Sequence, residues 1–476
     1  RLASVQFLSV NYTIIQYQLS KGLDMNKLVK TIEDFFVKNR ERFIYIHMFM
    51  LNVFLVLILV PAFLPLPSED AAIFNNFTLV ARFILWGLWF PLVLLSVVLF
   101  GRLWCGLLCP QGALSEYAGR RGFNKPIPRW MRWEGMPIIS FIVVTILGQL
   151  VGVRDYPLAA LEVLGGTMVI AAIVGFLYAS GWRPWCRYLC PIGPLLGIFS
   201  RLGAVSFNPP HPPLLKGGTG GVAGDGRGCV CPTFINTANK VASSNCIECF
   251  RCVNPETSHS LHLRIRRPGL EIEEIKKREP SLWEVVFLFL ATGLALGAFH
   301  WQVNPVYIQY KQAVGGFLLN RGLGEFIGKN GPWWLMVNYP QAGETFIWLD
   351  FISITTFMLI GMAGIVIILF MLTMLSASIV REKDPIMATV AKLGYLYAPV
   401  ALISLIIGLG LILFQSLNDI GIDKDVVRIA QGFLFAAGGM WSLYLAVRLH
   451  NGWSMAVIPN IIGIAVVTAA WHRVLF

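Results

Sequence analysis

Long apolar runs, separated by short polar segments, dominate this chain. A helix of about 20 apolar residues is enough to cross the hydrocarbon core of a membrane. Runs of this kind lie near residues 43–65, 79–100, 135–153, 166–182, 283–300, 347–377, 389–414, 429–448 and 453–471. The run at 347–377 is longer than one crossing needs, so we expect its helix to be tilted, kinked or extended past the bilayer. The pattern predicts an all-α polytopic membrane protein with about nine transmembrane helices.

Composition agrees with this fold class. Hydrophobic residues make up 56% of the chain and charged residues 13%, whereas a soluble domain carries about 25% charged residues. The net charge is +12, but no basic patch is interleaved with a motif that reads nucleic acid. We therefore expect a lipid bilayer as the partner and no nucleic acid, with the excess of Lys and Arg marking cytoplasmic loops.

The distribution of basic residues predicts an orientation. Lys and Arg are frequent before the first run, around residues 102–132 and throughout 183–282, while the loops 66–78 and 154–165 carry almost none. The positive-inside rule places the basic segments in the cytoplasm and the protein in the inner membrane. Four regions follow: a cytoplasmic N-terminal segment (1–42), a four-helix membrane part (43–200), a cytoplasmic linker and lobe (201–282), and C-terminal membrane helices (283–476).

Two segments that follow membrane runs nearly repeat each other. Residues 102–112 and 183–193 both read R-x-W-C-x-x-L-C-P-x-G. Proline has no backbone donor and disfavours helix at the residue before it. The chain therefore turns away at each Cys-Pro unit and presents the sulfur. Matched cysteine pairs at the mouths of two membrane helices indicate ligands of a metal cluster at the membrane surface.

A third group of cysteines follows a Pro/Gly-rich linker at 209–228. It contains Cys229 and Cys231, the latter before proline, and then a C-x2-C-x2-C run at Cys246, Cys249 and Cys252. In a tight loop, thiolates with this spacing can converge on three irons of one cubane, and the fourth iron needs a ligand from elsewhere. The run therefore predicts a small ferredoxin-like iron–sulfur lobe.

Taken together, the two Cys-Pro motifs and the ferredoxin-like run resemble the membrane-bound iron–sulfur proteins of the NapH, NosR and CcoG group over roughly residues 79–260. The resemblance implies [4Fe–4S] electron transfer on the cytoplasmic side, often coupled to quinol or to a partner redox complex. The chain departs from a full ferredoxin motif, which would have Cys and Pro where Glu256 and Thr257 stand.

Eight thiolates are enough for two [4Fe–4S] clusters. We assign one cluster to Cys105, Cys109, Cys186 and Cys190, and the other to Cys231, Cys246, Cys249 and Cys252. Cys229 is then spare and is a possible substitute. The pairing is open to interchange, because cysteines before proline often bind a neighbouring cluster. We expect no catalytic residue.

The same motifs allow other interpretations. A four-thiolate zinc site also uses C-x2-C pairs, but the triple-cysteine run and the Cys-Pro units favour iron–sulfur. The Arg and Trp residues of the two motifs, at 102, 104, 183 and 185, could tune a cluster potential. Such residues are more often interfacial aromatics and positive-inside arginines, and this second interpretation is favoured.

Histidines in membrane spans raise the hypothesis of a b-type haem. The pairs His300 with His472 and His47 with His450 match in depth, but interfacial histidines are commoner, so haem is the less favoured cofactor. A quinone site is consistent with the chain but has no sequence signature. Few charges lie within the spans, with Arg82 and Asp350 at their edges, which does not indicate dedicated ion pumping.

The leading hypothesis is an electron conduit between quinone or quinol, or a partner redox subunit, and two [4Fe–4S] clusters. Such a chain is an electron-transfer subunit of an oxidoreductase complex rather than a stand-alone enzyme. Two rivals remain: a maturation factor that reduces a metal or a thiol for another enzyme, and a membrane anchor of a larger respiratory complex.

Overall fold

This computed structural model describes residues 25–68, 71, 73–179, 181–209, 231–237, 240–253, 261–380, 384–419 and 421–475. Within these residues, eight helical spans are long and apolar enough to cross a membrane. They are Arg40–Ala62, Phe77–Phe100, Pro157–Tyr178, Leu282–Gln302, Trp348–Val380, Ile386–Leu409, Lys424–Leu449 and Met455–Arg473. The prediction of an all-α polytopic membrane protein is confirmed. The run expected at 135–153 forms a shorter helix of 16 residues, α7 (Met136–Val151).

The first half of the chain forms a membrane part in which several spans are interrupted. Its elements are α2 (Met25–Lys38), α3 (Phe43–Ala62), α4 (Phe77–Arg82), η3 (Phe83–Trp89), α5 (Phe90–Phe100), η4 (Trp104–Leu108), α6 (Pro110–Gly119), α7, α8 (Pro157–Ala160), η5 (Leu161–Gly165), α9 (Gly166–Tyr178), α10 (Pro184–Tyr188) and α11 (Gly193–Ser200). The elements η3, η4 and η5 are π-helical turns, which are frequent at functional sites.

Local sequence sets several of these boundaries. The Asn76 side chain accepts hydrogen bonds from the amides of Thr78 and Leu79 and so caps α4. Helix α5 ends at Gly101, whose φ of 63° favours glycine. A proline opens each of α6 and α10, where its missing N–H costs nothing.

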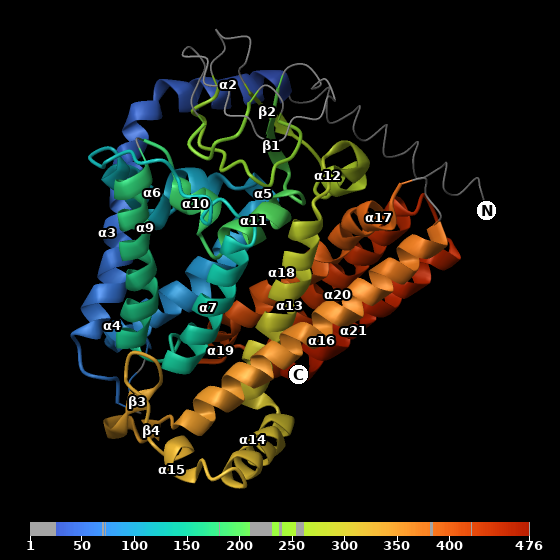
Figure 1. Cartoon of the computed structure of the whole chain (residues 1–476). Helices are drawn as coiled ribbons and strands as arrows, with labels where there is room; N and C mark the ends of the chain where they lie inside the picture. The colour runs from blue at the N-terminus through green and yellow to red at the C-terminus, as the bar shows by residue number, and fades with distance from the viewer. Residues whose placement is uncertain are drawn as a thin grey trace.

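The second half forms a bundle of long helices (Figure 1). The helices of this half are α13 (Leu282–Val303), α14 (Pro305–Leu319), α15 (Gly324–Ile327), α16 (Trp348–Val380), α17 (Ile386–Leu393), α18 (Ala398–Leu409), α19 (Leu411–Asp419), α20 (Lys424–Leu449) and α21 (Ile458–Leu475). Of these, α14 and the short α15 lie at one end of the bundle (Figure 1). The long run at 347–377 is one helix of 33 residues, about 50 Å in length, so it exceeds the roughly 30 Å hydrocarbon core.

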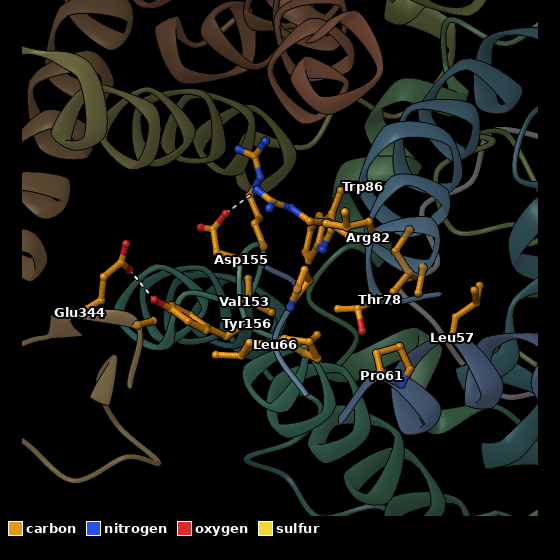
Figure 2. Close-up of a pocket in the computed structure, with 18 residues that line it drawn as sticks. Leu57, Pro61, Leu66, Thr78, Arg82, Trp86, Val153, Asp155, Tyr156 and Glu344 are labelled. Carbon is orange, nitrogen blue, oxygen red and sulfur yellow. Dashed lines mark hydrogen bonds and ion pairs between the residues drawn. The ribbon is translucent and has the colours of Figure 1, made fainter. Parts of the chain in front are cut away.

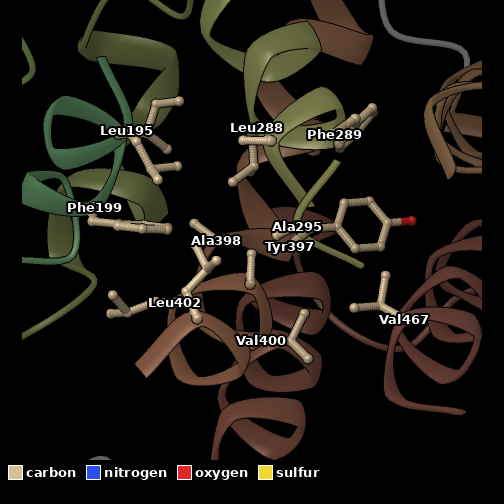
Figure 3. Packing of buried hydrophobic residues seen from close by; sticks show 14 of the residues in the cluster. Leu195, Phe199, Leu288, Phe289, Ala295, Tyr397, Ala398, Val400, Leu402 and Val467 are labelled. Carbon is tan, nitrogen blue, oxygen red and sulfur yellow. The ribbon is translucent and has the colours of Figure 1, made fainter. Parts of the chain in front are cut away.

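The main hydrophobic core joins the two halves. Figure 3 shows Leu195 and Phe199 of α11 facing Leu288 of α13 and Leu402 of α18. All four side chains are almost completely buried. Because α11 directly follows the second Cys-Pro motif, this packing fixes that motif against the C-terminal bundle.

A small lobe lies at one end of the helices, beside α2 (Figure 1). Its strands β1 (Val205–Asn208) and β2 (His262–Ile265) pair in an antiparallel register with Phe207 opposite Leu263. The short helix α12 (Leu270–Glu273) follows. At the opposite end of the helices, β3 (Asn338–Tyr339) and β4 (Glu344–Thr345) form a small hairpin.

One buried arginine ties the lobe to the membrane helices. Arg201 is 1% exposed, and its guanidinium donates to Glu271 at 3.1 Å and to Glu284 at 2.9 Å. Glu271 belongs to the lobe helix α12, whereas Glu284 lies in the first turn of α13. Buried charges have to be paired in this way, so the arginine fixes how the lobe sits on the bundle.

Candidate metal centres

Four cysteines from the two repeated motifs line one cavity of about 290 Å³. They are Cys105, Cys109, Cys186 and Cys190. Cys105 lies in the π-helical turn η4, and Cys186 lies in α10. Cys109 is extended, with φ −67° and ψ 116°, and the following proline starts α6. The turn expected at this Cys-Pro unit is therefore present, and we call these cysteines the first thiol set.

The remaining cysteines of the described chain line a second, narrower cavity in the lobe. They are Cys231, Cys246, Cys249 and Cys252, which we call the second thiol set. Between the last three, Glu248 and Phe250 adopt left-handed backbone conformations with φ of 52° and 57°. These reversals curl the C-x2-C-x2-C run into a tight loop. Phe36 of α2 covers the loop by stacking on Phe250 at 3.8 Å between ring centroids.

The division of the thiols between the two cavities is the one assigned from the sequence. Cys229 lies outside the described residues. Among the described cysteines none forms a disulfide. The ligand roles of all eight described cysteines stay predictions.

The two thiol sets adjoin through a backbone contact. Gly106, which follows Cys105 of the first set, lies against the loop of the second set. A Cβ atom at this position would lie 2.3 Å from the carbonyl oxygen of Ile247 and 2.9 Å from the amide nitrogen of Cys249. Only glycine permits this approach. The contact brings the two motif types together, although about 140 residues separate them in sequence.

The two motif arginines are buried beside the first thiol set. Arg102 is 4% exposed, with its guanidinium 2.5 Å from the carbonyl oxygen of Ser244 and 3.8 Å from the sulfur of Cys105. Arg183 is 1% exposed and donates to the carbonyl oxygens of Cys105 at 2.8 Å and Gly106 at 3.3 Å. The interpretation of these arginines as interfacial anchors is therefore wrong, because each is enclosed by protein and bound to it.

Burial makes the free thiols hard to ionise. It raises the pKa of Cys190 and of Cys246 to about 12, and the pKa of Cys109 to about 11. A buried thiolate needs nearby positive charge. Arg102 and Arg183 supply part of it, and metal ions bound by the sulfurs would supply the rest.

The sulfurs of the first thiol set line a cavity and are not gathered around the position of one metal ion. Among the described residues, no group of three or more His, Cys, Asp or Glu side chains is placed to hold a single metal ion. A zinc ion binds four thiolates at about 2.3 Å each, which requires a compact group. Sulfurs arranged around a cavity suit a cluster with one thiolate for each of its irons. In the first thiol set, the cavity of about 290 Å³ therefore fits a [4Fe–4S] cluster better than a lone zinc ion.

An acidic residue that the sequence analysis missed organises the charges here. Glu116 of α6 is 4% exposed and binds the guanidinium groups of Arg183 and Arg120 at 2.9 Å each, and that of Arg251. Burial by itself would raise the pKa of Glu116, but Arg183 and Arg251 outweigh it and lower the pKa to about 2. The available signal was a carboxylate within the apolar segment that follows Cys109.

The histidines proposed for a haem are engaged with protein groups. The imidazole of His300 contacts the Ala470 carbonyl at 3.1 Å through Nε2 and the Asn304 amide at 2.9 Å through Nδ1. Nε2 of His47 lies 3.0 Å from the carbonyl oxygen of Gly106. A haem iron needs a free ring nitrogen, which His300 lacks in this arrangement.

Comparison with known proteins finds the same two motifs. A family model described as a 4Fe-4S binding domain matches residues 83–128 and 163–210. Each matched segment contains one Cys-Pro motif, so the match covers the contributors to the first thiol set. The C-x2-C-x2-C run lies outside it. The resemblance to membrane-bound [4Fe–4S] electron-transfer proteins is thereby confirmed.

Several relatives are similar over part of the chain. A putative electron transport protein, YccM of Escherichia coli, is 24% identical over 44% of this chain and 64% of its own length. A protein of Methanocaldococcus jannaschii is 27% identical over 32% of this chain and 61% of its own. Protein NirI of Paracoccus denitrificans is 25% identical over 34% of this chain and 26% of its own. No solved structure matches.

The chain thus spans about three fifths of the first two relatives. Its two Cys-Pro segments match a 4Fe-4S binding domain, and the described part of the chain has several helices long and apolar enough to cross a membrane. The match to the 4Fe-4S binding domain lies wholly before the C-terminal bundle.

Proposed function

We propose that this chain holds two [4Fe–4S] clusters and conducts electrons between them and a quinone or a partner redox subunit. One observation carries the proposal: two sets of four thiols lie next to each other, with Gly106 of one motif against the backbone of Cys249 in the other. Adjacent clusters exchange single electrons, which is the chemistry they would supply here. The protein side chains fix the irons, exclude water and balance charge.

Two buried arginines beside the first thiol set support its proposed role as the ligand set of a cluster. Arg102 and Arg183 place two buried positive charges beside sulfurs that carry negative charge when they bind iron. Charges and hydrogen bonds of this kind tune the potential of a cluster. Trp104 and Trp185 line the same cavity and exclude water from it, and exclusion of solvent also sets the potential of a cluster.

The shape of the first cavity supports quinone as a partner. Beyond the thiols it continues between aromatic and aliphatic side chains that include Phe54, Trp89, Phe141 and Phe299. Apolar walls with a few polar groups are typical of sites for flat, apolar ligands. A quinone ring in this space would lie next to the first thiol set, and its apolar tail would reach the lipid.

Charge asymmetry supports the orientation. The basic segments, the lobe and both Cys-Pro motifs lie at one end of the helices, and the weakly charged loops lie at the other (Figure 1). By the positive-inside rule, this distribution supports our proposal that the thiol sets lie on the cytoplasmic face of the inner membrane.

Metal content tests the two clusters directly. We expect about eight irons and as many acid-labile sulfides in each anaerobically purified chain, with an electron paramagnetic resonance signal after reduction. Cys109→Ser and Cys246→Ser should each lose about four irons, whereas Cys229→Ser, the spare cysteine, should lose none. Zinc in place of iron, with no signal in the reduced protein, would refute the proposal.

A second measurement identifies the molecule that exchanges electrons with the clusters. In vesicles, a short-chain quinol should reduce the clusters of the isolated chain if quinone is the partner. Reduction that requires a subunit co-purifying in fixed ratio would instead identify the chain as part of a larger complex. A maturation factor would be absent from such a purified complex.

A further inference from the structure

A second large cavity opens at the end of the helices opposite the lobe. It has a volume of about 550 Å³ and is formed by the ends of α3 and α4, the start of α8 and the loop before β4. Figure 2 shows its two kinds of wall. Leu57, Pro61 and Trp86 form an apolar side, and Asp155 and Tyr156 lie on a polar side. We call it the outer cavity.

The outer cavity meets the thiol-lined cavity of about 290 Å³. Trp86, Val153 and Arg154 line both of them. A third cavity of about 90 Å³ lies beside them, and Val153 and Arg154 line it as well. These shared residues place the space next to the first thiol set directly against the cavity that opens at the face opposite the lobe.

No such connection leads toward the lobe among the cavities described. A lobe-side cavity of about 560 Å³ is lined by His47, Glu116 and Arg183, among others. It shares no lining residue with the thiol-lined cavity. The packing of Gly106 against Ile247 lies between the first thiol set and the lobe. Among these cavities, the thiol-lined cavity therefore adjoins the outer cavity and not the lobe-side cavity.

The outer cavity carries the polar groups that a proton path needs. The guanidinium of Arg82 binds the Asp155 carboxylate at 2.6 Å, and the Tyr156 hydroxyl donates to the Glu344 carboxylate at 2.5 Å. The Asp155 side chain is 51% exposed, so water reaches this group. Arg82 lies within the span Phe77–Phe100, and charged side chains within membrane spans mark water-filled cavities and proton relays.

We infer that protons exchanged by quinone beside the first thiol set enter and leave through the outer cavity, so that electron transfer in this chain separates charge across the membrane. The inference rests on the proposed function. Oxidation of one quinol to quinone breaks two O–H bonds and yields two electrons and two protons. The electrons pass to the iron–sulfur centres, one to each, on the lobe side. The protons pass to water at the opposite face.

The sidedness holds for either direction of electron flow. When quinone is reduced to quinol, two protons are taken up from the outer cavity, and the electrons come from the lobe side. Separation of electrons and protons in this way needs no dedicated ion pump. It requires only that the quinone touches water on one side and the clusters on the other.

Sealed vesicles with the chain in one known orientation test the sidedness. A short-chain quinol serves as the donor, ferricyanide on the lobe side as the acceptor, and a membrane-impermeant pH dye reports each compartment. We expect about two protons per quinol to appear on the face opposite the lobe. Appearance of these protons on the lobe side overturns the inference. A chain that never oxidises quinol instead contradicts the proposed function, so the two failures differ.

Variants of two carboxylates in the outer cavity test whether these side chains carry the protons. We expect Asp155→Asn combined with Glu344→Gln to slow proton appearance at least ten-fold, while reduction of the clusters by dithionite stays complete. Unchanged proton release in this variant would remove these carboxylates from the path. Iron content and the resonance spectrum show whether the variant is intact.

A labelling experiment tests whether water reaches the cavity wall, and it needs no quinol oxidation. Val153, which lines all three cavities, is replaced by cysteine, and a small charged thiol reagent is added to the face opposite the lobe. We expect Val153→Cys to react, whereas Val97→Cys, a fully buried core position, stays unlabelled. Equal protection of both positions would show that no water-filled connection exists.

Discussion

Arg183 offers the sharpest test of how the protein controls the centres. Its guanidinium is 1% exposed, donates to the carbonyl oxygen of Cys105 at 2.8 Å and pairs with Glu116 at 2.9 Å. It also acts electrostatically on the sulfurs of Cys186 and Cys249, which belong to different thiol sets. The perturbation is Arg183→Gln, which removes one positive charge from between the two sets and keeps a polar side chain.

Coulomb's law gives the size of the effect. For a charge about 7 Å from a cluster centre at an effective dielectric constant of about 20, the interaction is about 2.4 kcal/mol. A one-electron couple shifts by about 59 mV for each 1.4 kcal/mol, so we expect a change of about 100 mV. Reduction adds negative charge, and loss of the arginine disfavours the reduced state. The reduction potential should therefore fall.

A redox titration followed by electron paramagnetic resonance measures this shift. Two controls accompany it. Arg183→Lys keeps the charge and should recover most of the wild-type potential. Arg120→Gln removes a partner of the same Glu116, but its side chain is 52% exposed, and screening by solvent should leave the potential within about 20 mV. A potential in Arg183→Gln that equals the wild-type value, with full iron content, would refute the reasoning.

Three further predictions concern stability and assembly. A methyl group at Gly106 would meet the Ile247 carbonyl, so Gly106→Ala should lose about four irons while Gly166→Ala, with no atom within 4 Å, keeps all of them in an iron assay. Arg201→Met leaves buried Glu271 without one of its partners, and such a loss costs about 3–5 kcal/mol, to be measured as a lower thermal unfolding midpoint in detergent. Burial alone would raise the pKa of Glu271, but Arg201 and Arg266 outweigh it and lower the pKa from 4.5 to about 2. The stability that the ionised Glu271 contributes is therefore present above pH 4.5 and lost as the pH falls toward 2. Glu271→Gln should flatten the acid limb of a curve of unfolding free energy against pH, and an unchanged limb would contradict the assignment.

Local chemistry made part of this molecule predictable. An apolar run of sufficient length has no alternative to a helix in a membrane, because its backbone groups must bond within the segment. The residue before a proline avoids helix, which set Cys109 in an extended conformation. Spacing in the C-x2-C-x2-C run allowed three thiols to share one site, and they line one cavity. Each of these conclusions depends on residues within a few positions of one another.

Prediction from local pattern failed for the motif arginines. Arg102 and Arg183 have the composition and position of interfacial anchors, and most such residues are anchors. They are buried here because Ser244 and Glu116, distant in sequence, supply the carbonyl and carboxylate partners that a buried guanidinium requires. The sequence near either arginine contains no sign of its distant partner.

By itself, then, the sequence determined the helical membrane fold, the two Cys-Pro motifs and the C-x2-C-x2-C run, since these follow from chain solvation and from short-range spacing. Which distant cysteines lie together was left open. The tertiary structure alone decided the contact of Gly106 with the second motif, the buried charges and the outer cavity. Tyr156 and Glu344, which bond across that cavity, are 188 residues apart. Such pairs arise only when whole helices pack, because helix packing depends on the combined surface of many residues and no single segment encodes it.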